Sequence, residues 1–309
     1  MTTARQGRLP QHRIAEIVAS ELRARILAAD GDYRLPTQDQ LVSDFGVSYP
    51  SVREAIRILE TEGLVTVRRG NVGGAEVHRP NQSSAAYHLG LALQSRQVTL
   101  GDLAASLQLL EPLCTAECAK RPDRATVVIP ALEANIAESA DLISDGVAFT
   151  RVAREFHDLL VSFTPNATIQ HLMGTLVTLW SAQEQTWAEA MTQRGEYPSP
   201  QEAARAVSTH RHIAEKIAAG NTAEAEHCAR AHLIATQKLV LERFEEGIVN
   251  VSSVQARQAI ASNRPSGLLL SRRGLSGPVR RHLPMPTPQR AARARPRPGM
   301  ASSVSAATN

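Results

Sequence analysis

Residues 46–65 read GVSYPSVREAIRILETEGLV, a short loop followed by a run with helical spacing that stops at Gly63. The apolar side chains of this run recur at the spacing that places them on one side of a helix: Val52, Ala55, Ile56 and Leu59. Arg53 and Arg57 are four residues apart, so they share a different face. The stretch predicts a short helix with one apolar seam and one cationic face.

The segments on either side predict two further helices and a hairpin. Residues 12–29 have the apolar spacing of a helix, and Thr37 with Gln40 fits a capping box that opens a second helix, which Gly46 ends. The third helix starts at Ser48 or at Ser51, since both positions suit an N-cap. Two short alternating strands follow around a glycine-rich tip: residues 64–69 and 75–79.

Helix, helix, short turn, helix and a two-stranded wing is the layout of a winged helix-turn-helix, a DNA-binding unit. The major groove admits one α-helix, and Arg53 lies near the helix start, where it can pair with guanine O6 and N7. Phosphate contacts are expected near the helix N-terminus and minor-groove contacts at the wing. The remaining predicted DNA-contacting residues are Thr37, Ser48, Tyr49, Pro50, Ser51, Arg57, Arg68, Arg69 and Gly70.

The bulk composition favours a two-domain, soluble, cytoplasmic protein. The 309 residues are 43 % hydrophobic, the N-terminus has no apolar signal segment, and no apolar run approaches the roughly 18 residues of a membrane span. Three cysteines do not form a disulfide framework. The net charge of +4 comes from the C-terminal end, because residues 251–309 contain ten arginines and no acidic residue.

The rest of the chain predicts a helical bundle and then a tail. Proline and glycine residues divide residues 82–247 into seven helical segments, which indicates an all-helical domain. The predicted segments are 84–95, 99–119, 123–144, 147–163, 166–191, 200–219 and 222–246. The expected domains are residues 1–80, 81–249 and, as an Arg/Pro-rich disordered tail, 250–309.

The N-terminal residues resemble the GntR family of bacterial regulators. The resemblance rests on Leu35-Pro36-Thr37 and on the run from Gly46-Val47-Ser48 to Glu62-Gly63-Leu64-Val65. It implies a DNA-binding homodimer whose second domain controls its affinity for a double-stranded operator.

Two positions depart from the pattern of that family. Asp39 stands where the family usually has an arginine, and Tyr49 stands where it often has another. Both family arginines can contact DNA. The attraction of this chain to DNA phosphates is therefore expected to be weaker than is usual in the family, and its operator sequence different.

The helical region resembles the FCD effector domain of the FadR-like subfamily. The matching stretches are Leu110-Glu111-Pro112, Glu155-Phe156-His157, Pro165-Asn166 and the run from Thr209-His210 to Ala231-His232-Leu233. The resemblance implies an all-α fold and a small-molecule effector.

Many FCD domains bind a divalent metal through one aspartate and three histidines, and this resemblance places the histidines at His157, His210 and His232. Three imidazoles suit Zn²⁺ or Ni²⁺. The aspartate position holds Ala153, so both a three-histidine metal site and a metal-free pocket stay open. Leu107 occupies the position of a family arginine that meets acidic effectors, and these five residues form the predicted effector pocket.

The sequence therefore predicts a ligand-responsive transcriptional regulator that acts as a repressor on a palindromic operator. One alternative is an architectural protein that binds DNA non-specifically through its basic tail. A second is a three-histidine metalloenzyme, which is disfavoured because no catalytic motif accompanies the histidines. The chain is therefore not expected to be an enzyme.

Overall fold

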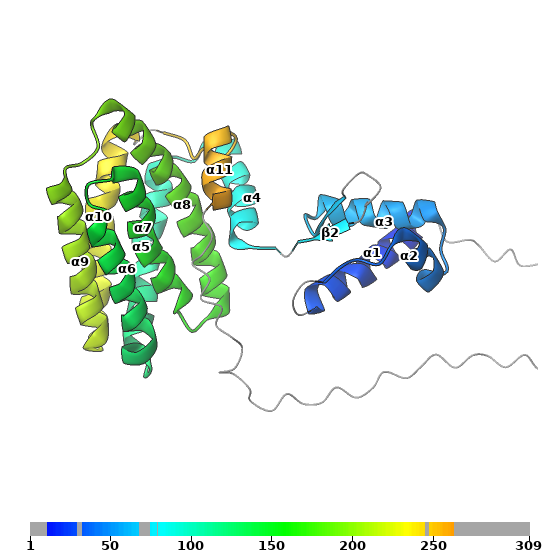
Figure 1. Ribbon diagram of the computed structural model, residues 1–309, viewed down its shortest axis with the longest axis horizontal. Helices are drawn as coiled ribbons and strands as arrows, with labels where there is room; N and C mark the ends of the chain where they lie inside the picture. Colours follow the sequence, from blue (N-terminus) through cyan, green and yellow to red (C-terminus); the bar gives the residue numbers. More distant parts are fainter. Residues whose placement is uncertain (1–10, 30–32, 68–74, 79, 245–246, 263–309) are drawn as a thin grey trace, which may run out of the picture. The chain divides into compact units, whose positions relative to one another are not determined.

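The computed structural model describes residues 11–29, 33–67, 75–78, 80–244 and 247–262, which form a small N-terminal head and a larger helical domain (Figure 1). The head contains α1 (Gln11–Ala28), α2 (Gln38–Phe45), α3 (Tyr49–Thr61), β1 (Val65–Val67) and β2 (Ala75–Val77). This order is that of a winged helix-turn-helix, as predicted.

Local capping sets the ends of α2 and the start of α3. The side chain of Thr37 accepts a hydrogen bond from the Gln40 backbone amide, and the Gln40 side chain accepts one from the Thr37 backbone amide. Gly46 takes a left-handed conformation with φ of 62°, which ends α2. Ser48 is the N-cap of α3, and this settles the start that the sequence left ambiguous.

The apolar seam of α3 forms the core of the head. All four of its predicted members are buried, and they pack with side chains from α1 and α2. The largest of these partners are Leu22, Ile26 and Leu41, each with no exposed surface. Burying a side chain of this size contributes about 1.5–3 kcal/mol to stability, so the seam holds α3 in place.

The wing is a short antiparallel hairpin. Val65 pairs with Val77 and Val67 pairs with Ala75, so three residues of each strand are paired within the described part of the hairpin. The wing tip, residues 68–74, lies outside the described residues.

The helical domain contains all seven predicted helices (Figure 1). The third of them starts as a short π-helical segment, η1 (Arg124–Val128), before it continues as α6. The elements are α4 (Gln82–Ser95), α5 (Leu100–Lys120), α6 (Ile129–Asp141), α7 (Gly146–Ser162), α8 (Ala167–Arg194), α9 (Pro200–Ala218) and α10 (Thr222–Phe244). None of the described helices combines the length and hydropathy needed to cross a membrane.

The expectation that disorder begins at residue 250 is wrong for the first part of that segment. The chain continues into an additional helix, α11 (Val254–Ser262), which packs against α4 and α8. Val251 and Ile260 are 0 % and 3 % exposed and belong to the same core cluster as Trp180. A few apolar residues spaced to meet an existing surface are enough to order the segment. Residues 263–309 lie outside the described part of the chain.

Backbone and side-chain hydrogen bonds fasten residues 247–262, which we call the C-terminal strap, to the helical domain. The Leu100 amide donates to the Gly247 carbonyl at 2.7 Å, and the Val249 amide donates to the Val98 carbonyl at 3.0 Å. Gln183 on α8 bonds both the carbonyl and the amide of Asn250. The strap is thus bonded to α8 and to the loop between α4 and α5.

Candidate functional site

The outer face of α3 presents the cationic residues that the sequence predicts. Arg53 and Arg57 are exposed, and a shallow groove beside them is lined by His12, Pro50 and Glu54. Arg57 forms an ion pair with Glu54 at 3.5 Å, whereas Arg53 forms none with the described residues. Arg53 is therefore available for contact with a nucleic acid.

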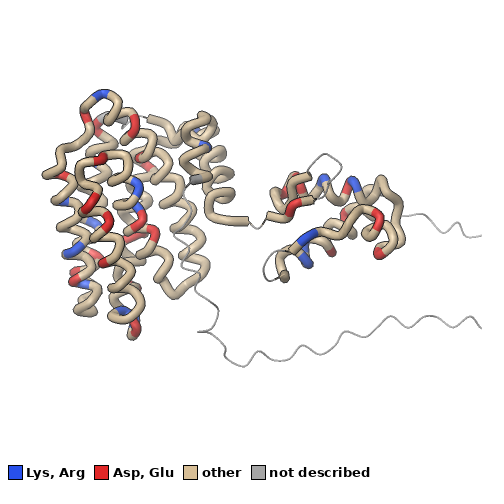
Figure 2. Tube along the Cα trace, viewed as in Figure 1, with Lys and Arg blue, Asp and Glu red and all other residues tan. Residues whose placement is uncertain are grey.

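The two departures from the GntR pattern contact each other. The Tyr49 hydroxyl donates a hydrogen bond to Asp39 Oδ1 at 3.0 Å, which joins the first turn of α3 to that of α2. This hydrogen bond and the nearby carboxylate raise the pKa of Tyr49. Acidic and basic residues are interspersed on the head (Figure 2), in line with the 11 basic and 10 acidic residues of the segment 1–80.

The other predicted DNA contacts divide into three groups. Thr37, Ser48 and Pro50 are exposed, although Thr37 already serves as the cap of α2. Ser51 is only 2 % exposed and its hydroxyl pairs with that of Ser48 at 3.0 Å, so the prediction of a phosphate contact from Ser51 is wrong. The wing residues Arg68, Arg69 and Gly70 lie outside the described part of the chain.

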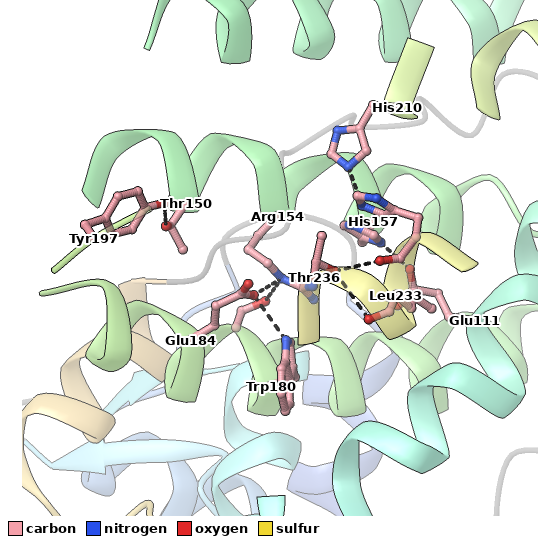
Figure 3. A network of polar contacts seen from close by, with 12 residues as sticks. Glu111, Thr150, Arg154, His157, Trp180, Glu184, Tyr197, His210, Leu233 and Thr236 are labelled. Atoms are coloured by element: carbon pink, nitrogen blue, oxygen red, sulfur yellow. Dashed lines mark hydrogen bonds and ion pairs between the residues drawn. The ribbon is translucent and has the colours of Figure 1, made fainter. Parts of the chain in front are cut away.

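The helical domain brings the three predicted histidines together (Figure 3). His157 comes from α7, His210 from α9 and His232 from α10, and all three are buried. One potential ligand atom from each lies within 4.8 Å of the others, and His210 Nε2 is 2.9 Å from His232 Nε2. Their rings also pack on one another, with His157 and His232 stacked at a centroid distance of 5.3 Å.

This cluster fits a divalent metal. Burial, followed by the neighbouring histidines, lowers the pKa of His210 and of His232 well below the ordinary value, so both imidazoles are held neutral, which is the form that binds metal. Glu111 on α5 forms a hydrogen bond with His157 Nδ1, which leaves the other ring nitrogen for an ion. Burial opposes ionisation of Glu111, but His157 and then Arg154 lower its pKa overall.

A cavity of about 300 Å³ opens beside the histidines. Ala153 lines it, one helical turn before His157, so the position of the usual aspartate presents a methyl group and no metal-binding oxygen to the cavity. The prediction that Leu107 lines the pocket is wrong: it is 0 % exposed within the apolar core and does not border the cavity.

A buried ionic group that the sequence analysis did not identify lies in the same cavity. Arg154 Nε is 3.1 Å from Glu184 Oε2 and donates to Ser181 Oγ at 3.2 Å (Figure 3). Trp180 Nε1 donates to the same carboxylate at 3.1 Å. Near them, the hydroxyls of Thr150 and Tyr197 are 2.7 Å apart.

The sequence signal for this group is weak. Arg154 and Glu184 are 30 residues apart on different helices, and charged residues on helices are most often solvated. The one usable hint is that Arg154 falls between the aspartate position and His157 in the sequence.

The geometry thus defines a DNA-binding protein whose helical domain holds an open cavity lined by buried histidines. Comparison with known proteins agrees with this class. Residues 13–73 match the family described as bacterial regulatory proteins, gntR family, and residues 102–235 match the FCD domain. The chain therefore belongs to the GntR family of transcriptional regulators and carries an FCD effector-binding domain, as in the FadR-like subfamily.

Individual relatives support this assignment. The HTH-type transcriptional regulator LutR of Bacillus subtilis is 25 % identical over 218 residues, which cover 70 % of this chain and 94 % of LutR. The HTH-type transcriptional repressor NanR of Edwardsiella tarda is 27 % identical over 168 residues, 52 % of this chain and 63 % of NanR. A Streptococcus agalactiae GntR structure has the same fold, with a TM-score of 0.55, 22 % identity, and coverage of 73 % of this chain and 99 % of that one.

These matches are to regulators and not to enzymes, so the prediction that the chain is a regulator is confirmed. The resemblance to the GntR family and to the FCD domain is confirmed as well.

Proposed function

We propose that this protein is a ligand-responsive repressor that binds a palindromic operator as a homodimer. The observation that carries the proposal is the presence of an exposed cationic helix face in the head and a cavity lined by three buried histidines in the helical domain. The first suits DNA and the second a small molecule, so one chain has both parts of a switch.

In this proposal α3 enters the major groove and Arg53 contacts a base edge. Arg57, Tyr49, Ser48 and Pro50 then face the backbone. A symmetric dimer presents two such helices, which explains why the operator is expected to have two-fold symmetry.

The same proposal places a divalent metal, Zn²⁺ or Ni²⁺, on His157, His210 and His232. Three buried nitrogen donors and the Glu111 hydrogen bond behind His157 support this placement. A metal held by these histidines would act as a Lewis acid toward an effector oxygen in the cavity. The effector then binds at Ala153 and the histidines, with Leu107 excluded by its burial.

Effector binding changes DNA affinity only if the cavity differs between a DNA-binding state and a released state of the dimer. Repression follows when the DNA-bound dimer excludes polymerase.

A regulator of chromosomal operators acts in the cytoplasm, which is the location we propose.

The DNA part of the proposal is tested by selecting an operator from random duplexes and measuring binding of Arg53→Ala. The variant is expected to lose about 1–3 kcal/mol of binding free energy and part of the base preference at one position. Arg96→Ala, an exposed arginine at the end of α4, is the matched control and keeps wild-type affinity. Unchanged specificity in Arg53→Ala contradicts the proposed role of α3.

The metal part is tested by elemental analysis of the purified protein. His210→Ala is expected to lose the bound metal, while His212→Ala, an exposed histidine on the same helix, retains it. Equal metal content in the wild type and His210→Ala excludes the site.

The architectural alternative makes the opposite prediction for the tail. A protein that binds DNA through residues 263–309 loses affinity when they are deleted and is insensitive to Arg53→Ala. A sequence-specific regulator instead loses operator affinity with Arg53→Ala and keeps its operator specificity when these residues are deleted.

A further inference from the structure

The head carries little net positive charge for a DNA-binding unit. Residues 1–80 contain 11 basic and 10 acidic residues. Arg23, Arg25 and Arg57 each form an ion pair with a glutamate. A paired arginine attracts phosphates weakly, because the neighbouring carboxylate cancels its field at a distance. The sequence-independent part of DNA affinity depends on the number of phosphates that cations neutralise, so the head by itself supplies little of it.

A stronger concentration of positive charge follows the C-terminal strap. Residues 263–309, which we call the arginine segment, contain nine arginines and neither a lysine nor an acidic residue, so their net charge is +9 with histidine neutral. The tenth arginine of the C-terminal region, Arg257, lies in α11 over the ring of Tyr87, 5.8 Å from its centroid. The net positive charge of the chain is thus concentrated outside the domain that is proposed to read the operator.

The C-terminal strap fixes the place where the arginine segment begins. Val251 and Ile260 of the strap are buried, and α11 packs against α4 and α8. The side chain of Gln94 on α4 donates a hydrogen bond to Ser252 Oγ at 2.9 Å and accepts one from the Val251 amide at 3.1 Å. The start of the segment is therefore held at α4 and α8 as long as the strap is folded.

This attachment point keeps the arginine segment close to bound DNA. Only residues 78–81 separate α4 from β2 of the head, and the 14 residues of α4 have a length of about 21 Å. The segment comprises residues 263–309, and a chain of that length spans up to about 150 Å. Duplex DNA that α3 holds therefore lies within the span of the segment.

The composition of the arginine segment favours double-stranded DNA over single-stranded nucleic acid. A guanidinium pairs with two phosphate oxygens at once, and duplex DNA presents one negative charge per roughly 1.7 Å of its axis. The segment contains no Phe, Trp or Tyr, whereas proteins that bind single strands stack bases on aromatic side chains. The segment thus has the groups for phosphate contact and lacks the groups for base stacking.

The helical domain competes for the same cations but is the weaker partner. Residues 81–250 contain 20 acidic and 13 basic residues, a net charge of −7. Some of the acids are already paired within the domain, such as Glu117 with Lys120. Duplex DNA offers a similar charge within about 12 Å and releases counterions when it is bound. While α3 holds the operator, the flanking duplex is also at a high effective concentration for the segment.

We propose that the arginine segment is a second DNA contact, which binds the phosphates of the duplex flanking the operator while α3 reads the operator itself. The inference rests on the proposed function, because the head must hold the DNA near the segment. It differs from the architectural alternative, in which the segment binds DNA without the head. The segment supplies affinity and salt dependence, and α3 supplies base preference.

The test compares the wild-type chain with a variant in which all nine arginines of the segment are replaced by glutamine. Fluorescence anisotropy measures binding to the selected operator with flanks of about 15 base pairs and to the operator alone, at several salt concentrations. On the flanked duplex the variant is expected to bind at least roughly ten-fold more weakly at low salt. The slope of log K against log salt should fall by at least about three units. On the operator alone the difference should shrink to within about three-fold.

Two further proteins control for charge and folding. Replacing the same nine arginines with lysine keeps the charge, so affinity is expected to stay within about three-fold of wild type and the salt slope within about one unit. A chain that ends at Ser262 repeats the test without the segment, and thermal unfolding checks that its core, which the described residues complete, is intact. In each protein the preference for operator over random flanked duplex should stay within about three-fold of wild type.

Several results overturn the proposal. An unchanged salt slope in the glutamine variant excludes the DNA contact, and an equal loss on both duplexes excludes the flanking site. Tighter DNA binding by the glutamine variant makes the segment an inhibitor of DNA binding. Segment-dependent binding to single-stranded RNA or to phosphatidylserine vesicles that is tighter than binding to random duplex assigns the segment to another partner.

The Arg53→Ala variant separates this inference from the proposed function. Loss of base preference in Arg53→Ala, together with an unchanged salt slope in the glutamine variant, overturns this inference alone. Unchanged base preference in Arg53→Ala, together with a reduced salt slope in the glutamine variant, overturns the proposed function and favours the architectural alternative.

Discussion

At the scale of single residues, the pair Tyr49–Asp39 changes the electrostatics of the DNA-binding face. Each residue stands at a position where the GntR pattern has an arginine, and the structure joins them by a hydrogen bond. Two cations that would attract phosphates are thus replaced by one carboxylate and one phenol. The exchange explains the near-neutral charge of the head and leaves Arg53 and Arg57 as the cations of the α3 face.

Asp39→Asn is expected to raise DNA affinity. The asparagine side chain still accepts the Tyr49 hydrogen bond, so the local structure is kept while one negative charge near the phosphates is removed. We expect operator binding about two- to five-fold tighter at low salt, with a smaller gain at high salt. Asp141→Asn, which removes an exposed charge from the end of α6, is the control for net charge alone. Equal effects of both variants in a salt titration contradict the prediction.

The ion pair Arg23–Glu62 joins α1 to the end of α3 and makes the stability of the head depend on pH. Arg23 donates to both carboxylate oxygens, at 2.8 and 2.5 Å, and this hydrogen bonding lowers the pKa of Glu62. A carboxyl whose pKa is lower in the folded state stabilises it above the unfolded pKa, and this contribution disappears as the pH falls through the folded pKa.

Glu62→Gln is therefore expected to reduce the free energy of unfolding by about 0.5–1 kcal/mol at pH 7, since the pair is partly exposed and screened. The urea unfolding free energies of variant and wild type should converge as the pH falls from 7 through the lowered pKa of Glu62. Glu21→Gln, the control, removes the exposed ion pair with Arg25 on the same helix and should reduce the free energy of unfolding by less. A Glu62→Gln effect that stays constant across this pH range refutes the prediction.

At the scale of elements, α8 connects two regions of the helical domain. Ser181 and Glu184 bind Arg154 at the cavity, while Gln183 holds the C-terminal strap. Consecutive residues of a helix point to different sides, so α8 contacts the cavity with one face and the C-terminal strap with another. The strap therefore contacts the same helix that holds Arg154 at the cavity.

The strap packs closely against Gly90 on α4. A Cβ at this position would lie 2.4 Å from Val251 Cγ1 and 3.1 Å from Leu179 Cδ1. Gly90→Ala is expected to destabilise the domain by about 1–2 kcal/mol, although alanine is the better helix former by about 1 kcal/mol. With Val251→Ala the clash is removed, and the same change should become neutral or stabilising. A double-mutant cycle by thermal unfolding measures this coupling; additive effects refute it.

At the scale of the whole molecule, the helical domain extends to Ser262 rather than to residue 249. Two truncations test this boundary. Removing residues 250–309 exposes the core around Val251 and Ile260, and we expect a loss of at least about 3 kcal/mol in the free energy of unfolding. Removing residues 263–309 leaves the described core complete and should change stability by less than about 0.5 kcal/mol. Equal stability of both truncated proteins by calorimetry contradicts the assignment of the strap to the domain.

The elements of this protein follow from local sequence rules. Thr37, Gly46 and the seam around Leu59 predict the helices of the head because caps, left-handed glycines and apolar spacing act within one or two turns. The same rules, with the family resemblance, predict seven helices and the three histidines. They do not predict α11, because its nine residues have weak periodicity and become ordered only on the surface of α4 and α8.

The sequence by itself determined the architecture, the cationic face of α3 and the identity of the clustered histidines. Only the tertiary structure decided the surroundings of individual side chains. It buries Ser51 and Leu107, pairs Asp39 with Tyr49, and places Arg154 at the cavity beside Glu184. Secondary structure depends on neighbours along the chain. A ligand site instead depends on side chains from α7, α8, α9 and α10, whose relative placement arises from packing of the whole domain.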